Sequence, residues 1–343
     1  MQKADEIIRN LERKQYAPVY MLCGEESYYI DMVSAYMEEH ILDEASKAFD
    51  QMVLYGKDLP GADIAPAIAN ARGFAMMGGM KLIIVREAQT VKKWDALALY
   101  LDNPQPTTIL VICYKYGNPD KRLSVFKNIE KKGGVWMQSD RLRDYQMPAW
   151  IRDYMQQRLS ALSRKVDMDP KVPQMLADYL GADMSAVVGA VDKLIVGMPD
   201  GCTKIDMALV ERNVGISKDY NVFELQDALI KSDVLRAHRI TQYFASSKDH
   251  PMVKELGILY NFFANLMLYH YLPDKSERAV APVLGISPFF VKDYAAAARR
   301  FSAGKTFHII GYFREIDARS KGVNNPSAKD ADLWKELIYK ILH

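Results

Sequence analysis

Short apolar runs alternate with segments of helical periodicity through the first 139 residues. The runs are almost continuously apolar, and we expect strands at residues 18–23, 51–55, 82–85, 109–112 and 135–137. The segments between them predict helices at residues 28–41, 64–71, 94–101 and 123–131. Apolar strands that alternate with helices are typical of a parallel sheet covered by helices on both faces. The pattern therefore predicts an α/β domain over residues 1–139.

The rest of the chain has helical patterns and start signals. Pro148 suits the first turn of one helix, Asp169 and Pro170 the start of a second, and Asp183 the cap of a third. From residue 214 on there are no strong strand signals, and the long segment after Pro251 is apolar on most faces, as helices covered by their neighbours are. We predict a small helical domain at 140–213 and an all-α domain at 214–343.

Composition excludes several classes of protein. Lys and Arg number 45 and Asp and Glu 43, so the net charge of +2 argues against a strongly basic, stand-alone nucleic-acid binder. The N-terminal segment has no apolar run that predicts a signal peptide or a membrane span. The three cysteines and six histidines show no metal-ligand or catalytic-triad spacing. We expect a cytoplasmic, reduced chain without a metal or a membrane.

The turn after the first predicted strand is where a parallel sheet of this kind binds nucleotides. A phosphate-binding loop would read G-x-x-x-x-G-K-[ST]. Counted from Gly24, this chain has Tyr29 in place of the second glycine and Ile30 in place of the lysine. Glu25 and Glu26 put negative charge where a phosphate would enter. The sequence predicts a nucleotide-binding fold whose loop is degenerate.

The third predicted strand carries the second departure from a nucleotide site. A strand that holds magnesium ends in an acidic residue, but residues 82–85 are followed by Arg86 and only then by Glu87. A cation at that position disfavours a metal ion. We therefore expect no catalytic residue and no cofactor in this chain.

An apolar turn precedes the same strand. Phe74, Met76 and Met77 stand beside Gly78 and Gly79, which favour a turn. Methionine is flexible and polarisable, so two adjacent methionines on a turn can fill a pocket of another protein. One hypothesis is an exposed apolar knuckle. The alternative is that these side chains pack beneath their own sheet.

Several segments together resemble the delta subunit family of the bacterial DNA polymerase III clamp loader. The resemblance covers essentially the whole chain, and its segments are PVYMLCGEE (18–26), Met76-Met77 ahead of 81–85, DKR (120–122), LGAD (180–183), DKL (192–194), NVFEL (221–225) and DARSKG (317–322). The order and spacing of these segments together carry the resemblance. Two positions depart from the family: Ala190 stands where an acid is usual, and Ala75 where proline is frequent.

The resemblance implies an α/β plus all-α fold. Residues 1–139 would form an AAA+-like base domain without a working P-loop, 140–213 a helical lid, and 214–343 a collar that joins the loader subunits. Such a protein binds the β sliding clamp through Phe74, Met76 and Met77 and helps to open it for loading onto primed DNA. Its other partners would be the tau/gamma and delta prime subunits. It would have no ATPase activity of its own, although holoenzyme subunits are classed with DNA-directed DNA polymerases.

A stand-alone AAA-like or helix-turn-helix DNA-binding protein is the alternative. Residues 281–292 have the small-residue rhythm of a helix-turn-helix, but Phe289 and Phe290 fall where a reading helix needs polar side chains. The candidate contacts to DNA phosphates are four basic residues near the start of the last helical region, Lys292, Arg299, Arg300 and Lys305. A solvated helix face is the other interpretation of these residues.

Overall fold

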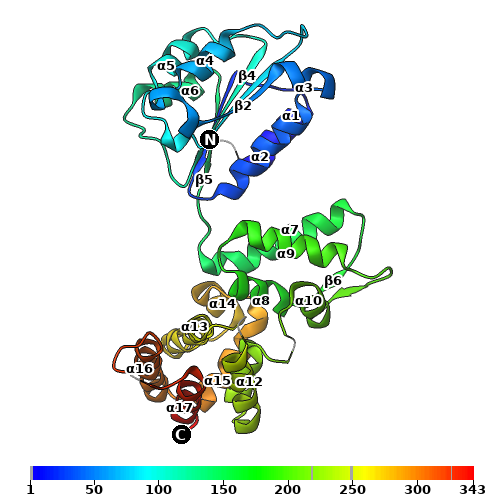
Figure 1. The fold of residues 1–343 in the computed structure, drawn as a ribbon. Helices are drawn as coiled ribbons and strands as arrows, with labels where there is room; N and C mark the ends of the chain where they lie inside the picture. The colour runs from blue at the N-terminus through cyan, green and yellow to red at the C-terminus, as the bar shows by residue number, and fades with distance from the viewer. Residues whose placement is uncertain (1–2, 218, 248–249, 326) are drawn as a thin grey trace. The chain divides into compact units, whose positions relative to one another are not determined.

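A computed structural model of the chain describes residues 3–217, 219–247, 250–325 and 327–343. The chain divides into two compact units, Met1–Leu142 and Arg143–His343, and each is described by itself. Figure 1 shows a sheet flanked by helices in the first unit and a mainly helical second unit.

The first unit contains a five-stranded parallel sheet with the order β2-β3-β4-β1-β5. Its strands are β1 (Val19–Gly24), β2 (Gln51–Tyr55), β3 (Lys81–Arg86), β4 (Thr108–Lys115) and β5 (Val135–Ser139). The three central strands, β3, β4 and β1, are buried along most of their length. Fully apolar strands fit this environment because side chains point into a core on both faces.

Helices cover both faces of this sheet. Side chains of α1 (Ala4–Glu12) and α2 (Ser27–His40) pack on one face, in a core that includes Leu22, Ile84 and Val111. Side chains of α4 (Ala65–Arg72), α5 (Asp95–Asp102) and α6 (Ser124–Lys131) pack on the other face. The five predicted strands and four predicted helices are confirmed to within a few residues. The short helix α3 (Glu44–Asp50) is an addition that the sequence pattern does not predict.

The second unit begins with four helices: α7 (Met147–Ala161), α8 (Lys171–Leu180), α9 (Met184–Val196) and α10 (Met207–Val214). The side chain of Asp183 caps α9 as predicted, accepting from the N–H of Ala186. Two very short parallel strands, β6 (Asp167–Met168) and β7 (Lys204–Ile205), were not predicted because two residues cannot show an alternation. Leu162, the residue that follows α7, is exposed.

The remaining helices share one apolar core, and the described residues from 214 on contain no strand. These helices are α11 (Val222–Ile230), α12 (Val234–Ser246), α13 (Met252–Tyr271), α14 (Glu277–Leu284), α15 (Val291–Arg300), α16 (Ala303–Ser320) and α17 (Asp330–Leu342). The long helix α13 buries side chains on several faces, as its composition predicts. Within the described residues, no helix combines the length and apolar character that crossing a membrane requires.

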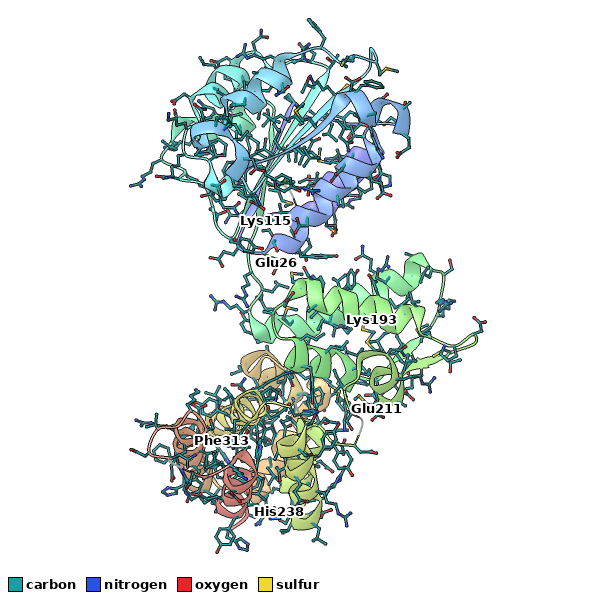
Figure 2. All side chains as sticks on the ribbon, viewed as in Figure 1. Glu26, Lys115, Lys193, Glu211, His238 and Phe313 are labelled. Carbon is teal, nitrogen blue, oxygen red and sulfur yellow. The ribbon has the colours of Figure 1, made fainter. Side chains whose placement is uncertain are left out.

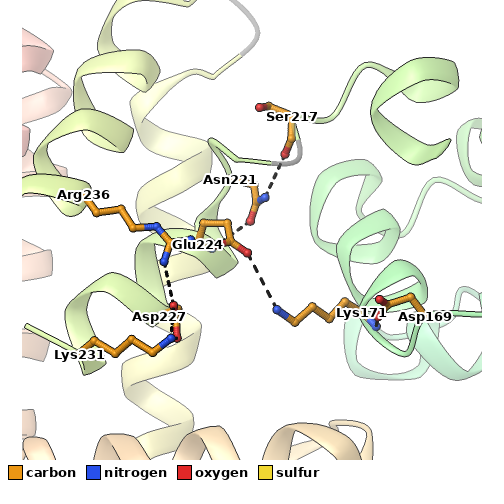
Figure 3. Close-up of polar contacts among 8 residues, drawn as sticks. All are labelled: Asp169, Lys171, Ser217, Asn221, Glu224, Asp227, Lys231 and Arg236. Atoms are coloured by element: carbon orange, nitrogen blue, oxygen red, sulfur yellow. Dashed lines mark hydrogen bonds and ion pairs between the residues drawn. The ribbon is translucent and has the colours of Figure 1, made fainter. Parts of the chain in front are cut away.

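Polar contacts at the start of α11 connect it to its neighbours (Figure 3). Asn221 caps the helix by accepting from the N–H of Glu224. The Glu224 carboxylate pairs with Arg236 of α12 and lies 4.0 Å from Nζ of Lys171 in α8. These contacts join α8 to α11 within one compact unit, so the division of this unit into a lid and a collar stays a prediction.

Candidate protein-interaction site

The knuckle, residues 73–80, connects α4 to β3. Phe74 is 82% exposed, Met76 76% and Met77 55%. Three large apolar side chains on one turn are therefore in water, which excludes the interpretation that they pack beneath their own sheet. Soluble proteins seldom expose adjacent apolar side chains unless a partner covers them.

The backbone of the knuckle follows from its glycines. Gly73 ends α4, and its N–H donates to the carbonyl of Asn70. Gly78 has a φ of 75°, a left-handed conformation that glycine adopts without steric cost. A Cβ built on Gly78 or Gly79 would contact nothing, which shows that this side of the turn is uncovered.

A buried carboxylate holds the knuckle from within. Asp50, the last residue of α3, is 1% exposed. Its Oδ1 accepts a hydrogen bond from the N–H of Met76 at 2.6 Å, and its Oδ2 accepts one from the N–H of Met77 at 2.9 Å. Sequence reasoning missed Asp50 because 26 residues separate it from Met76. Only the pairing of β2 with β3, in which Gln51 lies opposite Leu82, brings the two segments together.

The degenerate nucleotide loop lies at the carboxyl edge of the sheet, where Gly24 is opposite Lys115 and Figure 2 labels both Glu26 and Lys115. Gly24 has a φ of 139°, and a Cβ there would lie 1.9 Å from the carbonyl oxygen of Ser139. The close approach of β5 therefore requires glycine at this position, and this requirement is independent of phosphate binding. Glu25, by contrast, is exposed.

The N-terminus of α2 is occupied by the chain's own carboxylate. Oε1 of Glu26 accepts from the N–H of Tyr28 at 2.9 Å. Ile30, where a P-loop lysine would stand, is fully buried in the core, and the ring of Tyr29 packs edge-to-face on Tyr28. The helix end that would bind a phosphate is thus capped and carries a negative charge.

Arg86 ends β3 at the same edge of the sheet. Its guanidinium pairs with the carboxylate of Glu38 from α2, with Nη2 2.5 Å from Oε2. Lys115, at the end of β4, pairs with Asp31 at 2.6 Å. The first ion pair places a cation, held by an acidic residue of α2, where a magnesium-binding acid would be required. Among the described residues, no group of His, Cys, Asp and Glu side chains is arranged to hold a metal ion.

The four basic candidates for DNA contact do not form one cluster. Nη2 of Arg300 donates to the carbonyl of Leu342 at 3.3 Å, and Nζ of Lys305 donates to the carbonyl of Lys340 at 3.2 Å, so these two converge on the end of α17. Arg299 donates to the carbonyl of Ala295 on its own helix. Lys292 lies at the other end of α15, with Nζ 4.0 Å from the centre of the Phe289 ring.

Two consecutive helices, α14 and α15, cover the predicted helix-turn-helix segment, but the second helix starts in the core. Gly285 ends α14 in the left-handed conformation, and the turn leads into α15. Phe290 is buried at the start of α15 and stacks on Phe223. A recognition helix needs polar residues free at this position to contact base edges. The geometry therefore disfavours sequence-specific DNA reading.

Comparison with known proteins gives consistent matches over both units. One family model, described as DNA polymerase III, delta subunit, matches residues 20–137, and a second, for the C-terminal domain of that subunit, matches residues 219–328. The DNA polymerase III subunit delta of Bacillus subtilis (strain 168) is 23% identical over 345 residues, covering 97% of this chain and 95% of its own.

A solved structure, the DNA clamp loader delta protein of Bacillus subtilis, aligns over 99% of both chains with 21% identity and a TM-score of 0.54. The fold is thus the mixed α/β, AAA+-like fold of a clamp loader delta protein, with a helical C-terminal region. Because the delta subunit model matches the first unit and the model of that subunit's C-terminal domain matches the second, the chain belongs to the DNA polymerase III delta subunit family.

Proposed function

We propose that the chain is the delta subunit of a replicative clamp loader and that it binds and opens the β sliding clamp for loading onto primed DNA. Membership of the family supports the role in clamp loading and DNA replication. The observation that carries clamp binding is the exposure of Phe74, Met76 and Met77 on a turn that Asp50 holds from within.

The energetics of such a contact are favourable. Each large apolar side chain that leaves water contributes about 1.5–3 kcal/mol when it is fully buried in a partner. A few buried anchors commonly dominate the affinity of an interface. A single turn carries Phe74, Met76 and Met77 within residues 74–77, so the three side chains can enter one apolar pocket together. Methionine adapts its shape to the pocket that it fills.

The chain itself acts without ATP in this proposal. The capped N-terminus of α2, the buried Ile30 and the Arg86–Glu38 ion pair support this part. The energy of nucleotide binding and hydrolysis then comes from partner subunits of the loader, tau/gamma and delta prime. We place this work in the cytoplasm, away from any membrane.

The helical region from residue 214 on is the proposed collar that joins these subunits. A cavity of about 750 Å³ between α13 and α16 supports the proposal, because its lining is mainly apolar and includes the exposed side chains of Val253, Tyr260 and Phe307. A helix from the collar of a neighbouring loader subunit would cover these side chains. DNA contact, through Arg300 and Lys305, would be limited to the phosphate backbone.

Binding of the purified chain to the β sliding clamp of the same cell tests this proposal. The expected result is a saturable complex that does not require ATP. Tyr116→Ala is the control for variants of the knuckle. It removes an exposed apolar side chain elsewhere in the first unit, after β4, and should leave the affinity unchanged. Failure of the unmodified chain to bind the clamp would overturn the proposed function.

A further inference from the structure

We propose that Asp50 is a positioning residue for partner binding, which holds the backbone of the knuckle in the conformation that the partner recognises. This inference rests on the proposed function, because it concerns the same apolar turn. It adds a residue that never touches the partner, since the Asp50 side chain is buried beneath the knuckle.

The geometry of the carboxylate carries the inference. Both oxygens are used, and each accepts from a different one of the two consecutive backbone N–H groups at Met76 and Met77. In the part of the chain that the structure describes, no Lys, Arg or His forms an ion pair with Asp50. The charge is compensated instead by the two N–H groups, and such charge-assisted bonds are short and strong.

The knuckle needs such a constraint because of its composition. Gly73, Gly78 and Gly79 surround the apolar residues, and glycine has more backbone freedom to lose than any other residue. Ordering one residue of backbone costs about 1–2 kcal/mol. If the ordering is already done in the free protein, binding does not have to supply it, and the affinity rises.

The position of Asp50 connects this constraint to the rigid part of the domain. Asp50 directly precedes β2, which pairs with β3 from Gln51 opposite Leu82 onward. The knuckle directly precedes β3. The carboxylate therefore fixes the knuckle to the start of β2, the strand at the edge of the sheet. The side chains of Met76 and Met77 still project into water.

Three variants test the inference. Asp50→Ala removes both acceptors. Asp50→Asn keeps the shape but replaces one carboxylate oxygen by an NH₂ donor, so one of the two backbone N–H groups would face a donor and lose its acceptor. Asp63→Ala is the matched control, because it removes a carboxylate that accepts from the N–H of Ala65 elsewhere in the same unit. Clamp affinity and the amide hydrogen exchange of residues 73–80 are measured for each, together with the thermal midpoint.

The expected result for Asp50→Ala is a loss of clamp affinity of about five- to thirtyfold, converted from the ordering cost of roughly one residue. Exchange in residues 73–80 should accelerate while the strands stay protected. Asp50→Asn should fall between Asp50→Ala and the unmodified protein, and Asp63→Ala should lower only the thermal midpoint. In the Met76→Ala/Met77→Ala background, Asp50→Ala should have little further effect on clamp affinity.

The outcomes separate this inference from the proposed function. If Met76→Ala/Met77→Ala weakens the complex but both Asp50 variants bind as the unmodified chain does, Asp50 has no positioning role and the proposed function stands. An equal loss from Asp50→Ala with and without the two methionines also overturns the inference, because the effect is then not transmitted through the knuckle. If Asp50→Ala does not fold, Asp50→Asn and its exchange pattern decide the question.

Discussion

The carboxylate of Glu26 accepts a hydrogen bond from the N–H of Tyr28 at 2.9 Å, and by this contact the chain caps the helix end at which related folds bind a phosphate. The same loop is constrained from the other side by Gly24, against the carbonyl of Ser139. The contacts of this loop are packing contacts, which supports the proposal that this AAA+-like domain acts without ATP.

We predict that the chain does not bind ATP. Glu26 caps the N-terminus of α2, and the buried Ile30 stands where a P-loop has its lysine. Calorimetric titration with Mg-ATP at millimolar concentration should show no saturable heat. The variant Glu25→Gln/Glu26→Gln should behave in the same way, because neutralising the carboxylates does not supply the missing lysine. Saturable ATP binding by the unmodified chain would contradict the account.

Gly24→Ala should strongly destabilise the first unit. The added Cβ would lie 1.9 Å from the carbonyl oxygen of Ser139, in a backbone conformation that side chains rarely adopt. Overpacking of this kind costs about 1–3 kcal/mol or more in the free energy of unfolding. Gly189→Ala is the control, since a Cβ there meets nothing inside α9 and alanine favours a helix by about 1 kcal/mol. Chemical denaturation should give opposite signs for the two variants.

The ion pairs between α16 and α17 should give the second unit part of its acid sensitivity. Hydrogen bonds from Lys340 and Arg319 lower the pKa of Glu336 below its ordinary value of 4.5. A carboxyl group whose pKa is lower in the folded state than in the unfolded state stabilises the fold at pH values above its unfolded-state pKa. This stabilisation is lost as the pH falls through the folded-state pKa. Glu336→Gln should therefore lower the free energy of unfolding at pH 7 by less than about 1 kcal/mol, because the pair is partly exposed, and the thermal midpoint should fall slightly.

The pH profile checks this sign. The difference in midpoint between Glu336→Gln and the unmodified chain should shrink as the pH falls below 4.5. Glu277→Gln provides the comparison, because Glu277 lies in the first turn of α14 and has no ion pair among the described residues. A difference that grows on acidification would show that Glu336 is not stabilised in its charged form.

Any affinity for DNA should be weak, dependent on salt and independent of base sequence. Arg300 and Lys305 converge on the end of α17, whereas Lys292 lies at the far end of α15. If Arg300 and Lys305 each contact one phosphate, Arg300→Ala/Lys305→Ala should reduce the slope of log affinity against log salt by about 2. Lys292→Ala should leave this slope unchanged. Fluorescence anisotropy with two unrelated duplexes measures both properties. A tight complex with one duplex, lost on scrambling its sequence, would favour the helix-turn-helix alternative.

The central strands β1, β3 and β4 were predictable because they are buried along most of their length. Leu82, Ile83, Ile84 and Val85 are all fully buried, so no alternation with polar residues interrupts the apolar run. The strands β6 and β7, by contrast, have two residues each, and no pattern distinguishes them from a turn. A helix start was predictable where a side chain makes the cap, as at Asp183.

The candidate site was predictable only in part. The sequence placed Phe74, Met76 and Met77 on a turn but left their exposure open, because burial depends on what packs against them. Asp50 could not be found, since the order of strands in the sheet decides that its carboxylate meets the knuckle. The separation of Lys292 from Arg300 likewise depends on where α15 begins and ends.

The most direct test of the account compares the clamp affinity and the thermal midpoint of Met76→Ala/Met77→Ala with those of the unmodified chain. Both side chains project into water, so shortening them opens no cavity and the midpoint should stay within about a degree or two of the unmodified value. Clamp affinity should fall by at least about tenfold, because two anchors are lost and about 1.4 kcal/mol corresponds to one decade. A large drop in the midpoint with clamp binding intact in the folded fraction would contradict the account.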